Sequence, residues 1–320
     1  MSRSNDEIDG DEQRSGSEAI ARAADLLIAG KLVATPTETV YGLAADAANA
    51  PAVAEIYRTK GRPDFNPLIV HVLDLTVAKY LGQFNVHAEK LADAFWPGPL
   101  TLVVPKAPGC PVVPAVTAGL ETIALRSPAH PVMRRLLKET GLFLAAPSAN
   151  KSGGISPTTA RHVETSLGEK IPFILDGGPS QNGLESTIVE IDSEQCKILR
   201  PGSITADMLK KIINIPVDVL AAGDKITAPG QLSSHYAPTK QVRLNVVKPR
   251  DEEYHIGFGN IEGNANLSPA ADLAEAASNL FRFLHLADAS DMAAIAVAPI
   301  PSIGIGLAIN DRLQRAAMRR

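Results

Sequence analysis

Hydrophobic positions along the first two thirds of the chain switch repeatedly between helical spacing and short continuous runs. A helical repeat begins after Ser17, a candidate N-cap, and ends near Ala29, because Gly30 follows as a stop signal. Short apolar runs bounded by turn residues predict buried strands. The predicted helices are 17–29, 51–58, 74–81, 86–95, 130–141, 158–167 and 205–213, and the predicted strands are 31–35, 68–72, 100–104, 122–125, 142–146, 171–175, 186–191 and 197–199. This alternation indicates an α/β domain over residues 17–215.

The pattern changes twice outside that region. Residues 1–16 are polar and acidic-rich, which predicts a disordered tail. From residue 216 to 240 the periodicity disappears and Gly, Pro and Ser increase, so this segment is expected to be a linker. Beyond it, predicted strands at 242–247, 254–257 and 294–298 alternate with predicted helices at 269–286 and 307–317. Residues 241–320 are therefore expected to form a small α/β domain with a doubly wound sheet.

The composition agrees with two globular domains. The chain has 320 residues, of which 45% are hydrophobic, and its formal net charge is −4. A net negative charge argues against general attraction to nucleic acid or membrane surfaces, so any anion site requires a local group of cations. Cys110 and Cys196 are far apart and lack zinc-ligand spacing, which predicts reduced thiols and a cytoplasmic protein. The uncharged stretch 292–310 contains prolines and glycines, so a strand and turn are expected there rather than a membrane span.

The first candidate site is the basic segment Lys60-Gly-Arg62, which precedes the apolar run Leu68 to Val70. From an extended backbone, two cations two residues apart would point the same way, one as a compact charge and the other as a planar fork for phosphate oxygens. A solvated surface turn is the alternative, because short basic patterns are frequent by chance. If the segment is functional, a polyphosphate is the ligand that suits it.

Two further loops carry polar groups next to predicted strands. Thr35 to Leu43 combines three threonines with a glutamate and a tyrosine, and it is either a site loop or a Thr-rich edge strand. Pro147 to Gly154 offers hydroxyls, an amide and flexible backbone amides ahead of a helix, and it is either an anion-binding nest or a plain connector. Arg126 and Arg200 each follow a predicted strand, a position from which an arginine can face a cleft.

Other sequence signals are weaker. Gly304-Ile-Gly306 lacks the third glycine and the acidic partner of a dinucleotide-binding fingerprint. The chain has no Walker A, H-E-x-x-H or G-x-S-x-G motif. A triphosphate would therefore be bound without a P-loop.

Seven short motifs in one order resemble the YrdC-type threonylcarbamoyl-AMP synthases, in the long form that carries an extra C-terminal domain. They are Pro36-Thr-Glu-Thr-Val-Tyr-Gly42, Lys60-Gly-Arg62, Asn66-Pro-Leu-Ile-Val-His71, Trp96-Pro-Gly-Pro-Leu-Thr101, Pro147-Ser-Ala-Asn150, Glu185-Ser-Thr187 and Arg200-Pro-Gly202. The linker end Ser233-Ser-His-Tyr-Ala-Pro238 and the ending 306–317 are also similar to the long form.

The resemblance implies a twisted mixed sheet with a deep basic cleft, followed by a small Rossmann-like domain. It also implies an activity: L-threonine, bicarbonate or CO2, and ATP give threonylcarbamoyl-AMP and pyrophosphate. That product feeds the threonylcarbamoylation of the adenosine beside the anticodon in certain tRNAs, through a downstream transferase complex. Contact with tRNA itself is expected to be indirect at most, and no membrane is involved.

Matching by motif position, the resemblance also implies site residues. The threonine-binding residues are expected to be Thr39, His71, Arg126, Ala146 and Ser186. The ATP-binding residues are expected to be Lys60, Arg62, Asn66, Thr122, Ser148, Asn150, Ser156, Arg200, His235 and Tyr236, with Lys60 and Arg62 also catalytic. Mg²⁺ is expected to come with ATP, and neither a protein metal cage nor a tightly bound cofactor is expected.

The residues themselves support a mechanism of positioning and cationic stabilisation, with no covalent enzyme intermediate. Residues 216–240 form a long connection, so we expect this linker to fold over the cleft as a lid in which His235 and Tyr236 contact ATP. Two other functions stay open: an RNA-binding module without catalysis, and carbamoyl transfer to another acceptor, as in hydrogenase-maturation proteins that bear a similar module.

Overall fold

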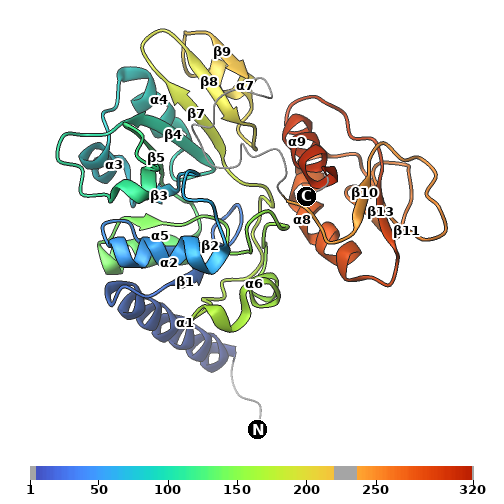
Figure 1. The fold of residues 1–320 in the computed structure, drawn as a ribbon, viewed down its shortest axis with the longest axis horizontal. Helices are drawn as coiled ribbons and strands as arrows, with labels where there is room; N and C mark the ends of the chain where they lie inside the picture. Colours follow the sequence, from blue (N-terminus) through green and yellow to red (C-terminus); the bar gives the residue numbers. More distant parts are fainter. Residues whose placement is uncertain (1–4, 220–235, 319–320) are drawn as a thin grey trace.

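The computed structural model describes residues 5–219 and 236–318, and the side chains from residue 16 onward. The helices are α1 Asn5–Ile28, α2 Ala50–Lys60, α3 Leu75–Leu81, α4 Val86–Phe95, α5 Pro131–Thr140, α6 Ala160–Leu167, α7 Ala206–Lys210, α8 Leu273–Ala289 and α9 Gly306–Ala317. The strands are β1 Val33–Thr35, β2 Gly42–Asp46, β3 Ile69–His71, β4 Leu100–Pro105, β5 Thr122–Arg126, β6 Leu144–Ala145, β7 Thr187–Ile191, β8 Cys196–Arg200, β9 Val217–Val219, β10 Gln241–Arg243, β11 Glu253–Gly257, β12 Ala265–Asn266 and β13 Ala294–Val297. Figure 1 shows two bodies, the first formed by residues 5–219 and the second by residues 236–318.

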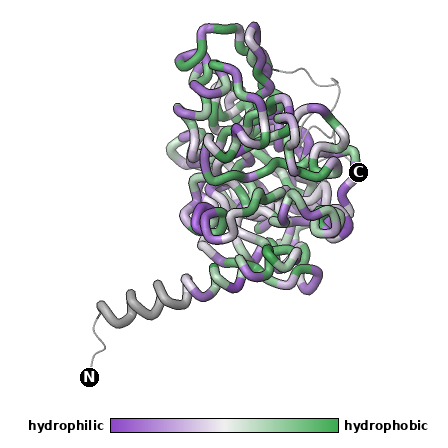
Figure 2. Tube along the Cα trace, turned by 90° about the vertical axis from the view of Figure 1, so that its left-hand side faces the viewer, coloured by the Kyte–Doolittle hydropathy of each residue, from purple (hydrophilic) through white to green (hydrophobic). Residues whose placement is uncertain are grey.

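The first body is built on one nine-stranded sheet in the order β1-β2-β6-β3-β5-β4-β7-β8-β9. The sheet is mixed, because β3 pairs with β5, β4 with β7 and β8 with β9 in parallel while its other neighbours are antiparallel. The expected mixed-sheet α/β fold is therefore confirmed. In Figure 2 the hydrophobic stretches of this body run through its middle.

The two faces of this sheet are covered differently. Leu102 and Leu125 lie opposite each other on β4 and β5, in a core cluster that includes Ile56 of α2, Leu81 of α3 and Leu91 of α4. On the other face, α1 and α5 pack over β1, β2 and β6 only. Strand alternation places side chains of the remaining strands on that second face, where none of the described helices of the first body covers them. This uncovered part of the sheet holds the candidate site.

Several short elements differ from the sequence expectation. The strands β2, β9 and β12 are not among the predicted ones, and residues 171–175 make only a bridge from Ile174 to Ala34. The strand β2 starts at Gly42 and is rich in alanine, and β9 is only three residues long, so neither has a strong strand signal. Because β9 pairs with β8, the sheet extends to residue 219 and the predicted linker start at 216 is wrong.

The chain start also differs. The helix α1 begins at Asn5 rather than after Ser17, so the predicted disordered tail is not met over residues 5–16, and residues 1–4 lie outside the described part. Residues 5–16 contain no proline, and the two glycines among them, Gly10 and Gly16, weaken a helix but keep their backbone N–H donors, so the helix can extend toward the N-terminus.

The second body contains a four-stranded parallel sheet in the order β10-β13-β11-β12. Its two helices, α8 and α9, contact each other and lie on the side of this sheet that faces the first body (Figure 1). The residues 292–310 form β13 and the start of α9, and no helix among the described residues is long and apolar enough to cross a membrane. The α/β character expected of residues 241–320 is met, while its Rossmann-like character stays a prediction.

Candidate functional site

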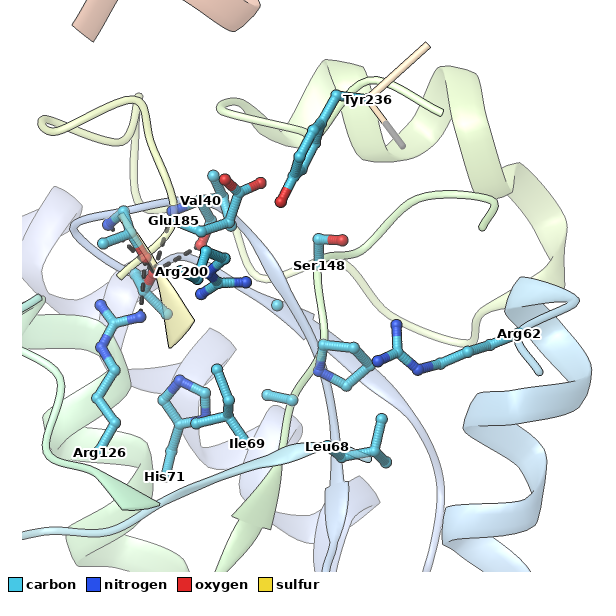
Figure 3. A pocket seen from close by; sticks show the side chains of 15 residues that line it. Val40, Arg62, Leu68, Ile69, His71, Arg126, Ser148, Glu185, Arg200 and Tyr236 are labelled. Carbon is cyan, nitrogen blue, oxygen red and sulfur yellow. Dashed lines mark hydrogen bonds between the residues drawn. The ribbon is translucent and has the colours of Figure 1, made fainter. Parts of the chain in front are cut away.

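A cavity lined by both polar and apolar side chains lies over the uncovered face of the nine-stranded sheet, and mixed linings of this kind are typical of small-molecule sites. Its polar lining comprises Thr37, Thr39, Arg62, His71, Arg126, Ser148, Glu185, Arg200 and Tyr236, and its apolar lining comprises Val40, Gly42, Leu68, Ile69, Ala146 and Pro147. Arg62 and Arg126 enter from opposite sides, and Tyr236 closes a third side (Figure 3). The cavity therefore has two separate cationic ends.

The basic segment forms the end of a helix rather than an extended turn. Lys60 is the last residue of α2, and Gly61 caps the helix in the left-handed conformation, at φ 61°. The expectation that Lys60 and Arg62 point the same way is therefore wrong. The helix C-cap turns the backbone between them, so the two side chains have different surroundings.

The Lys60 ammonium is fully buried beneath the loop 148–150. Its Nζ donates to the carbonyl oxygens of Ser148 and Asn150, each at 2.6 Å. Burial lowers the pKa of Lys60 well below its usual range, and the nearby charge of Arg62 lowers it further. Lys60 does not line the cavity and instead fixes the loop that does.

Arg62 lines the cavity and is anchored by backbone oxygens. Its Nε donates to the carbonyl of Asn66 at 3.1 Å, and its Nη2 donates to the carbonyl of Pro67 at 2.8 Å. Burial lowers the pKa of Arg62 to about 10, and the charge of Arg200 contributes to the decrease. Among the described residues Arg62 has no ion-pair partner, so a buried positive charge faces the cavity without an acid beside it.

Asn66 and the loop 148–150 carry further polar groups next to Arg62 and Lys60, and among these groups Ser148 lines the cavity. The Asn66 side chain is buried, and neither atom of its amide has a hydrogen-bond partner within the described part of the chain. Such a group is costly unless a ligand or water satisfies it. Ser148 Oγ donates to Asn150 Oδ1 at 2.6 Å, so these two predicted ATP-binding residues are held together.

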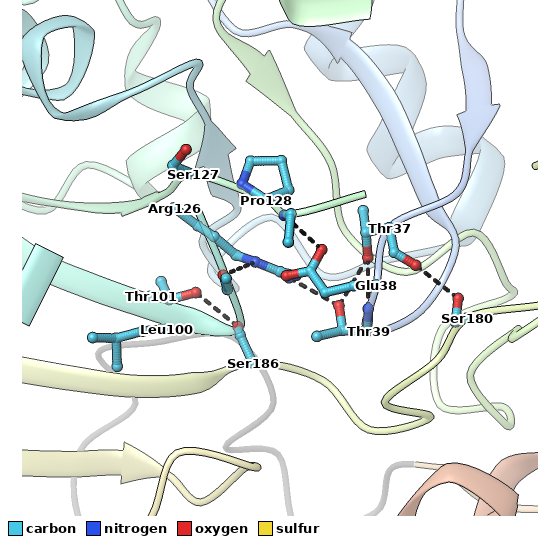
Figure 4. Close-up of polar contacts among 12 residues, drawn as sticks. Thr37, Glu38, Thr39, Leu100, Thr101, Arg126, Ser127, Pro128, Ser180 and Ser186 are labelled. Atoms are coloured by element: carbon cyan, nitrogen blue, oxygen red, sulfur yellow. Dashed lines mark hydrogen bonds and ion pairs between the residues drawn. The ribbon is translucent and has the colours of Figure 1, made fainter. Parts of the chain in front are cut away.

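Arg126, at the opposite end, belongs to a buried network (Figure 4). Its Nη2 donates to Glu38 Oε1 at 2.5 Å, its Nη1 to Thr39 Oγ1 at 2.9 Å, and its Nε to the Gly98 carbonyl at 3.2 Å. Burial acts to raise the pKa of Glu38, but the charge and hydrogen bond of Arg126 outweigh it and lower that pKa. The threonine-rich segment is thus a loop that orients Arg126, and the edge-strand alternative is wrong because β1 ends at Thr35.

His71 lies beside Arg126 on the paired strand. β3 and β5 place His71 directly opposite Arg126. Burial lowers the pKa of His71 to about 3, and the charge of Arg126 contributes, so the imidazole is neutral at neutral pH. Its Nδ1 has no hydrogen-bond partner among the described residues, which leaves it for a ligand in the cavity.

Ser186 connects this end to Arg200. Ser186 Oγ is 2.7 Å from Thr101 Oγ1 and 3.1 Å from Arg200 Nη2, and Arg200 also donates to the Ser186 carbonyl. Burial lowers the pKa of Arg200, while Tyr236 and Glu185 oppose the decrease. The Ser186 side chain is fully buried and borders the cavity through its neighbours rather than lining it.

The remaining predicted residues lie at different distances from the cavity. Ala146 and Tyr236 line it. Ser156 is buried behind the lining, where its Oγ donates to Glu185 Oε1 at 2.5 Å. Thr122 has the same strand parity as Arg126 but lies four residues away, about 13 Å along β5. His235 lies outside the described residues.

Sequence reasoning missed the two acidic partners of the site. Glu38 and Glu185 stand inside motifs that the sequence shows, yet their roles depend on partners far along the chain: Arg126 for Glu38, and Arg312 for Glu185. A carboxylate between two threonines, as for Glu38, or next to a serine, as for Glu185, was the available signal. The spacing of residues does not reveal which cation neutralises it.

Comparisons with known proteins agree in both bodies. A family model named for Sua5, YciO and YrdC, and described as "Telomere recombination", matches residues 25–202. A second model, described as "Threonylcarbamoyl-AMP synthase, C-terminal domain", matches residues 204–318. A threonylcarbamoyl-AMP synthase of Bacillus subtilis is 40% identical over 96% of this chain and 95% of its own. One of Pyrococcus abyssi is 38% identical over 92% and 93%.

The fold has a solved counterpart. The crystal structure of P. abyssi Sua5 complexed with L-threonine superposes with a TM-score of 0.85, at 37% identity, and covers 93% of this chain and 94% of that one. The mixed α/β architecture of both bodies is therefore shared with a solved protein of similar length.

Proposed function

This chain belongs to the Sua5/YrdC family of threonylcarbamoyl-AMP synthases, and from that premise we propose that it is an L-threonylcarbamoyladenylate synthase. It uses L-threonine, bicarbonate or CO2, and ATP, and it releases pyrophosphate. The product serves threonylcarbamoyladenosine formation in tRNA through a downstream transferase complex, with tRNA contacted only indirectly. The observation that carries the proposal is the cavity with two cationic ends, Arg62 and Arg126, on one face of one sheet.

The Arg62 end suits the triphosphate. Arg62 and Arg200 are buried cations that line the cavity, and Ser148 supplies a hydroxyl beside them. A guanidinium gives directed, charge-assisted hydrogen bonds to phosphate oxygens. Lys60 holds the loop of Ser148 and Asn150 from behind, so its contribution is to position that loop rather than to touch the phosphates. Asn66 is buried behind the lining, where its carbonyl accepts from Arg62, so its assigned part is to hold Arg62 in place.

The Arg126 end suits the amino acid. Three of the five N–H donors of Arg126 are used within the protein, which leaves two for a carboxylate. The neutral His71 lines the cavity and is a partner for the amine or the side-chain hydroxyl of threonine. The Ser186 hydroxyl is buried behind the lining, and its assigned part is to bond the threonine hydroxyl in place of one of its present partners, Thr101 and Arg200. Ala146 gives a small apolar part of the cavity lining.

The chemistry then needs little more than positioning. The threonine amine forms a C–N bond to CO2 and loses a proton, which gives a carbamate. A carbamate oxygen attacks the α-phosphorus in line, and the bond to the leaving pyrophosphate breaks. Negative charge increases on the phosphoryl oxygens, so Arg62 and Arg200 stabilise the transition state electrostatically.

Mg²⁺ belongs to the proposal as a component of the nucleotide substrate. Among the described residues no group of three or more His, Cys, Asp or Glu side chains is arranged to hold a metal ion. The carboxylate that lines the cavity, Glu185, is already bonded to Ser156 and Arg312. The described residues therefore do not fit a dedicated metal cage, and no step is assigned to one.

The linker supports the proposal at its described end. Tyr236 is almost fully buried and lines the cavity, and the next residue, Ala237, donates its backbone N–H to Gly153 at 2.9 Å. We propose that this end of the linker covers bound ATP and keeps water from the adenylate. The proposed part of His235 in the lid rests on the sequence resemblance alone.

The function is tested by pyrophosphate release from purified full-length protein with ATP and Mg²⁺. We expect release that needs both L-threonine and bicarbonate, and that disappears when either is omitted. Release that ignores threonine, or that follows another carbamoyl acceptor, would support the carbamoyl-transfer alternative. Tight binding of structured RNA without any release would support the RNA-binding alternative.

A further inference from the structure

One buried arginine of the second body reaches the site of the first. Arg312 belongs to α9 and is fully buried. Its Nε donates to Glu185 Oε2 at 3.1 Å, and its Nη1 donates to the Pro201 carbonyl at 2.6 Å and to Asp311 Oδ2 at 3.0 Å. Two of these three acceptors belong to the first body, more than 100 residues earlier in the chain.

The segments that Arg312 contacts border the cavity. Glu185 lines it and immediately precedes Ser186, while Pro201 immediately follows Arg200. The Arg312 guanidinium also lies over the Tyr236 ring, 5.4 Å from its centre, and Tyr236 forms the third side of the cavity (Figure 3). Arg312 thus joins α9, the linker end and the wall of the site through a single side chain.

The contact between the bodies is close enough to fix Arg312 in place. A Cβ on Gly183 would lie 2.4 Å from the Ser278 carbonyl oxygen of α8, so only glycine permits this approach. Ser278 Oγ donates to the Gln181 carbonyl at 2.7 Å, and His285 Nε2 lies 3.1 Å from the Ser156 carbonyl. The helix pair is therefore held against the loop that carries Glu185.

Charge gives this contact a consequence for ATP. Glu185 is a buried carboxylate on the wall of a cavity that we assign to a triphosphate. Unless a cation outside the cavity balances it, its negative charge would repel the phosphates or engage Arg200, the cavity cation that lies near it. Arg312 supplies that cation from outside the cavity, so it can neutralise Glu185 without contacting the nucleotide itself.

We propose that Arg312 is a positioning residue through which the C-terminal domain completes the ATP site: its charge neutralises Glu185, and its face holds Tyr236 over the cavity. This inference rests on the proposed function for the identity of the ligand. The C-terminal domain is then a component of the nucleotide site rather than an appended module.

The test measures the affinity of full-length variants for a non-hydrolysable ATP analogue, by calorimetry in the presence of Mg²⁺. Arg312→Ala should raise the Kd roughly 5- to 150-fold, the range of a typical coupling between sites. Arg312→Lys keeps the charge and should lose less affinity. Arg243→Ala is the matched control, because it removes an Arg–Glu ion pair of the same domain, with Glu253, away from the cavity.

The double variant Arg312→Ala/Glu185→Gln separates charge neutralisation from mere domain packing. If Arg312 acts by neutralising Glu185, removing the carboxylate should recover most of the affinity that Arg312→Ala loses. An unchanged Kd in Arg312→Ala, or a double variant no better than the single one, would overturn the proposal. Should Arg312→Ala fail to fold, the comparison of Arg312→Lys with Arg312→Lys/Glu185→Gln gives the same decision.

The affinity test of Arg312 can be decided separately from the test of the proposed activity. A wild-type protein that binds the analogue but makes no adenylate would contradict the proposed function, while the Kd pattern of the Arg312 variants would still decide the role of this residue. A KM for ATP that rises in Arg312→Ala with little change in kcat would agree with a role in nucleotide binding.

Discussion

The two faces of the nine-stranded sheet use neighbouring residues for opposite purposes. On one face Leu125 is buried against apolar side chains supplied by helices, while the next residue, Arg126, projects to the other face and lines the cavity. The same change occurs between Val70 and His71 on β3. Because a strand alternates its side chains, a single strand serves the core and the site together.

The two faces contribute in opposite directions to the stability of the fold. The helix-covered face gains stability from apolar burial. The cavity face instead buries three arginines and a histidine, and it loses stability for each desolvated charge or unpartnered amide. A face with that composition is retained for ligands, since a ligand with two anionic groups offsets the cost.

The largest effect on stability is expected from a large-to-small substitution in the core of the helix-covered face. Leu125→Ala should lower the free energy of unfolding by about 2 to 5 kcal/mol, because it leaves a cavity among fully buried side chains. Chemical denaturation measures it. Arg126→Lys, one residue away, should change stability far less and raise the KM for threonine, since lysine keeps a charge near Glu38 but loses the fork. A large loss of stability in Arg126→Lys, together with a raised KM and normal stability in Leu125→Ala, would contradict the claim that one face stabilises the fold and the other binds the ligand.

On the cavity face, Arg62→Ala should slow pyrophosphate release roughly 30- to 1000-fold, which corresponds to about 2 to 4 kcal/mol of lost transition-state stabilisation. Steady-state kinetics of the folded variant provide the measurement. The control is Arg58→Ala, which removes an exposed arginine from the last turn of α2, the helix that precedes Arg62. Near-normal release by Arg62→Ala would remove this residue from the mechanism.

A third prediction concerns the amino-acid end. L-threonine should be used at least about 100-fold more efficiently than 2-aminobutyrate, because a site that hydrogen-bonds a hydroxyl loses that bond with an analogue that lacks it. Competition between the two substrates gives the ratio of their kcat/KM values. Equal use of both would show that Ser186 and His71 do not bind the hydroxyl.

A smaller effect, on the pH dependence of stability, is expected from a histidine pair at the contact between the bodies. The rings of His162 and His285 stack at 3.8 Å, and burial lowers the pKa of His162 to about 4, with the charges of His285 and Arg161 contributing. Burial also lowers the pKa of His285, while its bond to Ser156 and the charge of Asp288 oppose the decrease. Because the unfolded chain then binds more protons, stability is lost as the pH falls from about 6.5 toward 4.

We expect the free energy of unfolding to decrease by roughly 1 kcal/mol between pH 7 and pH 5 through this pair, after allowance for solvent screening of these partly exposed rings. His162→Phe/His285→Phe should remove that part of the pH dependence. If the free energy of unfolding changed with pH by the same amount in the variant and in the parent protein, the histidine pair would not be the cause of this pH dependence.

The same two faces also differ in how far the sequence predicts them. The elements of the helix-covered face and the cavity-lining residues Arg62, His71, Arg126 and Arg200 follow from helix caps, apolar runs and motif order, which are local signals. The burial of Lys60 does not, because it depends on a left-handed cap at Gly61 followed by contact with a loop 88 residues later.

The acidic residues could not be predicted for a related reason. Glu38 is neutralised across 88 residues and Glu185 across 127. Such pairs are set by sheet order and by the docking of the second body, and neither follows from spacing along the chain. The strand β9 was missed for the opposite reason, since three residues carry too little pattern to identify a strand.

The proposed activity joins threonine, CO2 and ATP in one adenylate on the cavity face. It is measured by supplying ¹⁴C-labelled bicarbonate, L-threonine and ATP to the full-length protein and separating the nucleotides that form. We expect the label to appear in an adenylate that also contains threonine, in a one-to-one ratio with released pyrophosphate. Pyrophosphate accompanied by unlabelled AMP alone, under conditions where added threonylcarbamoyl-AMP survives, would contradict this activity.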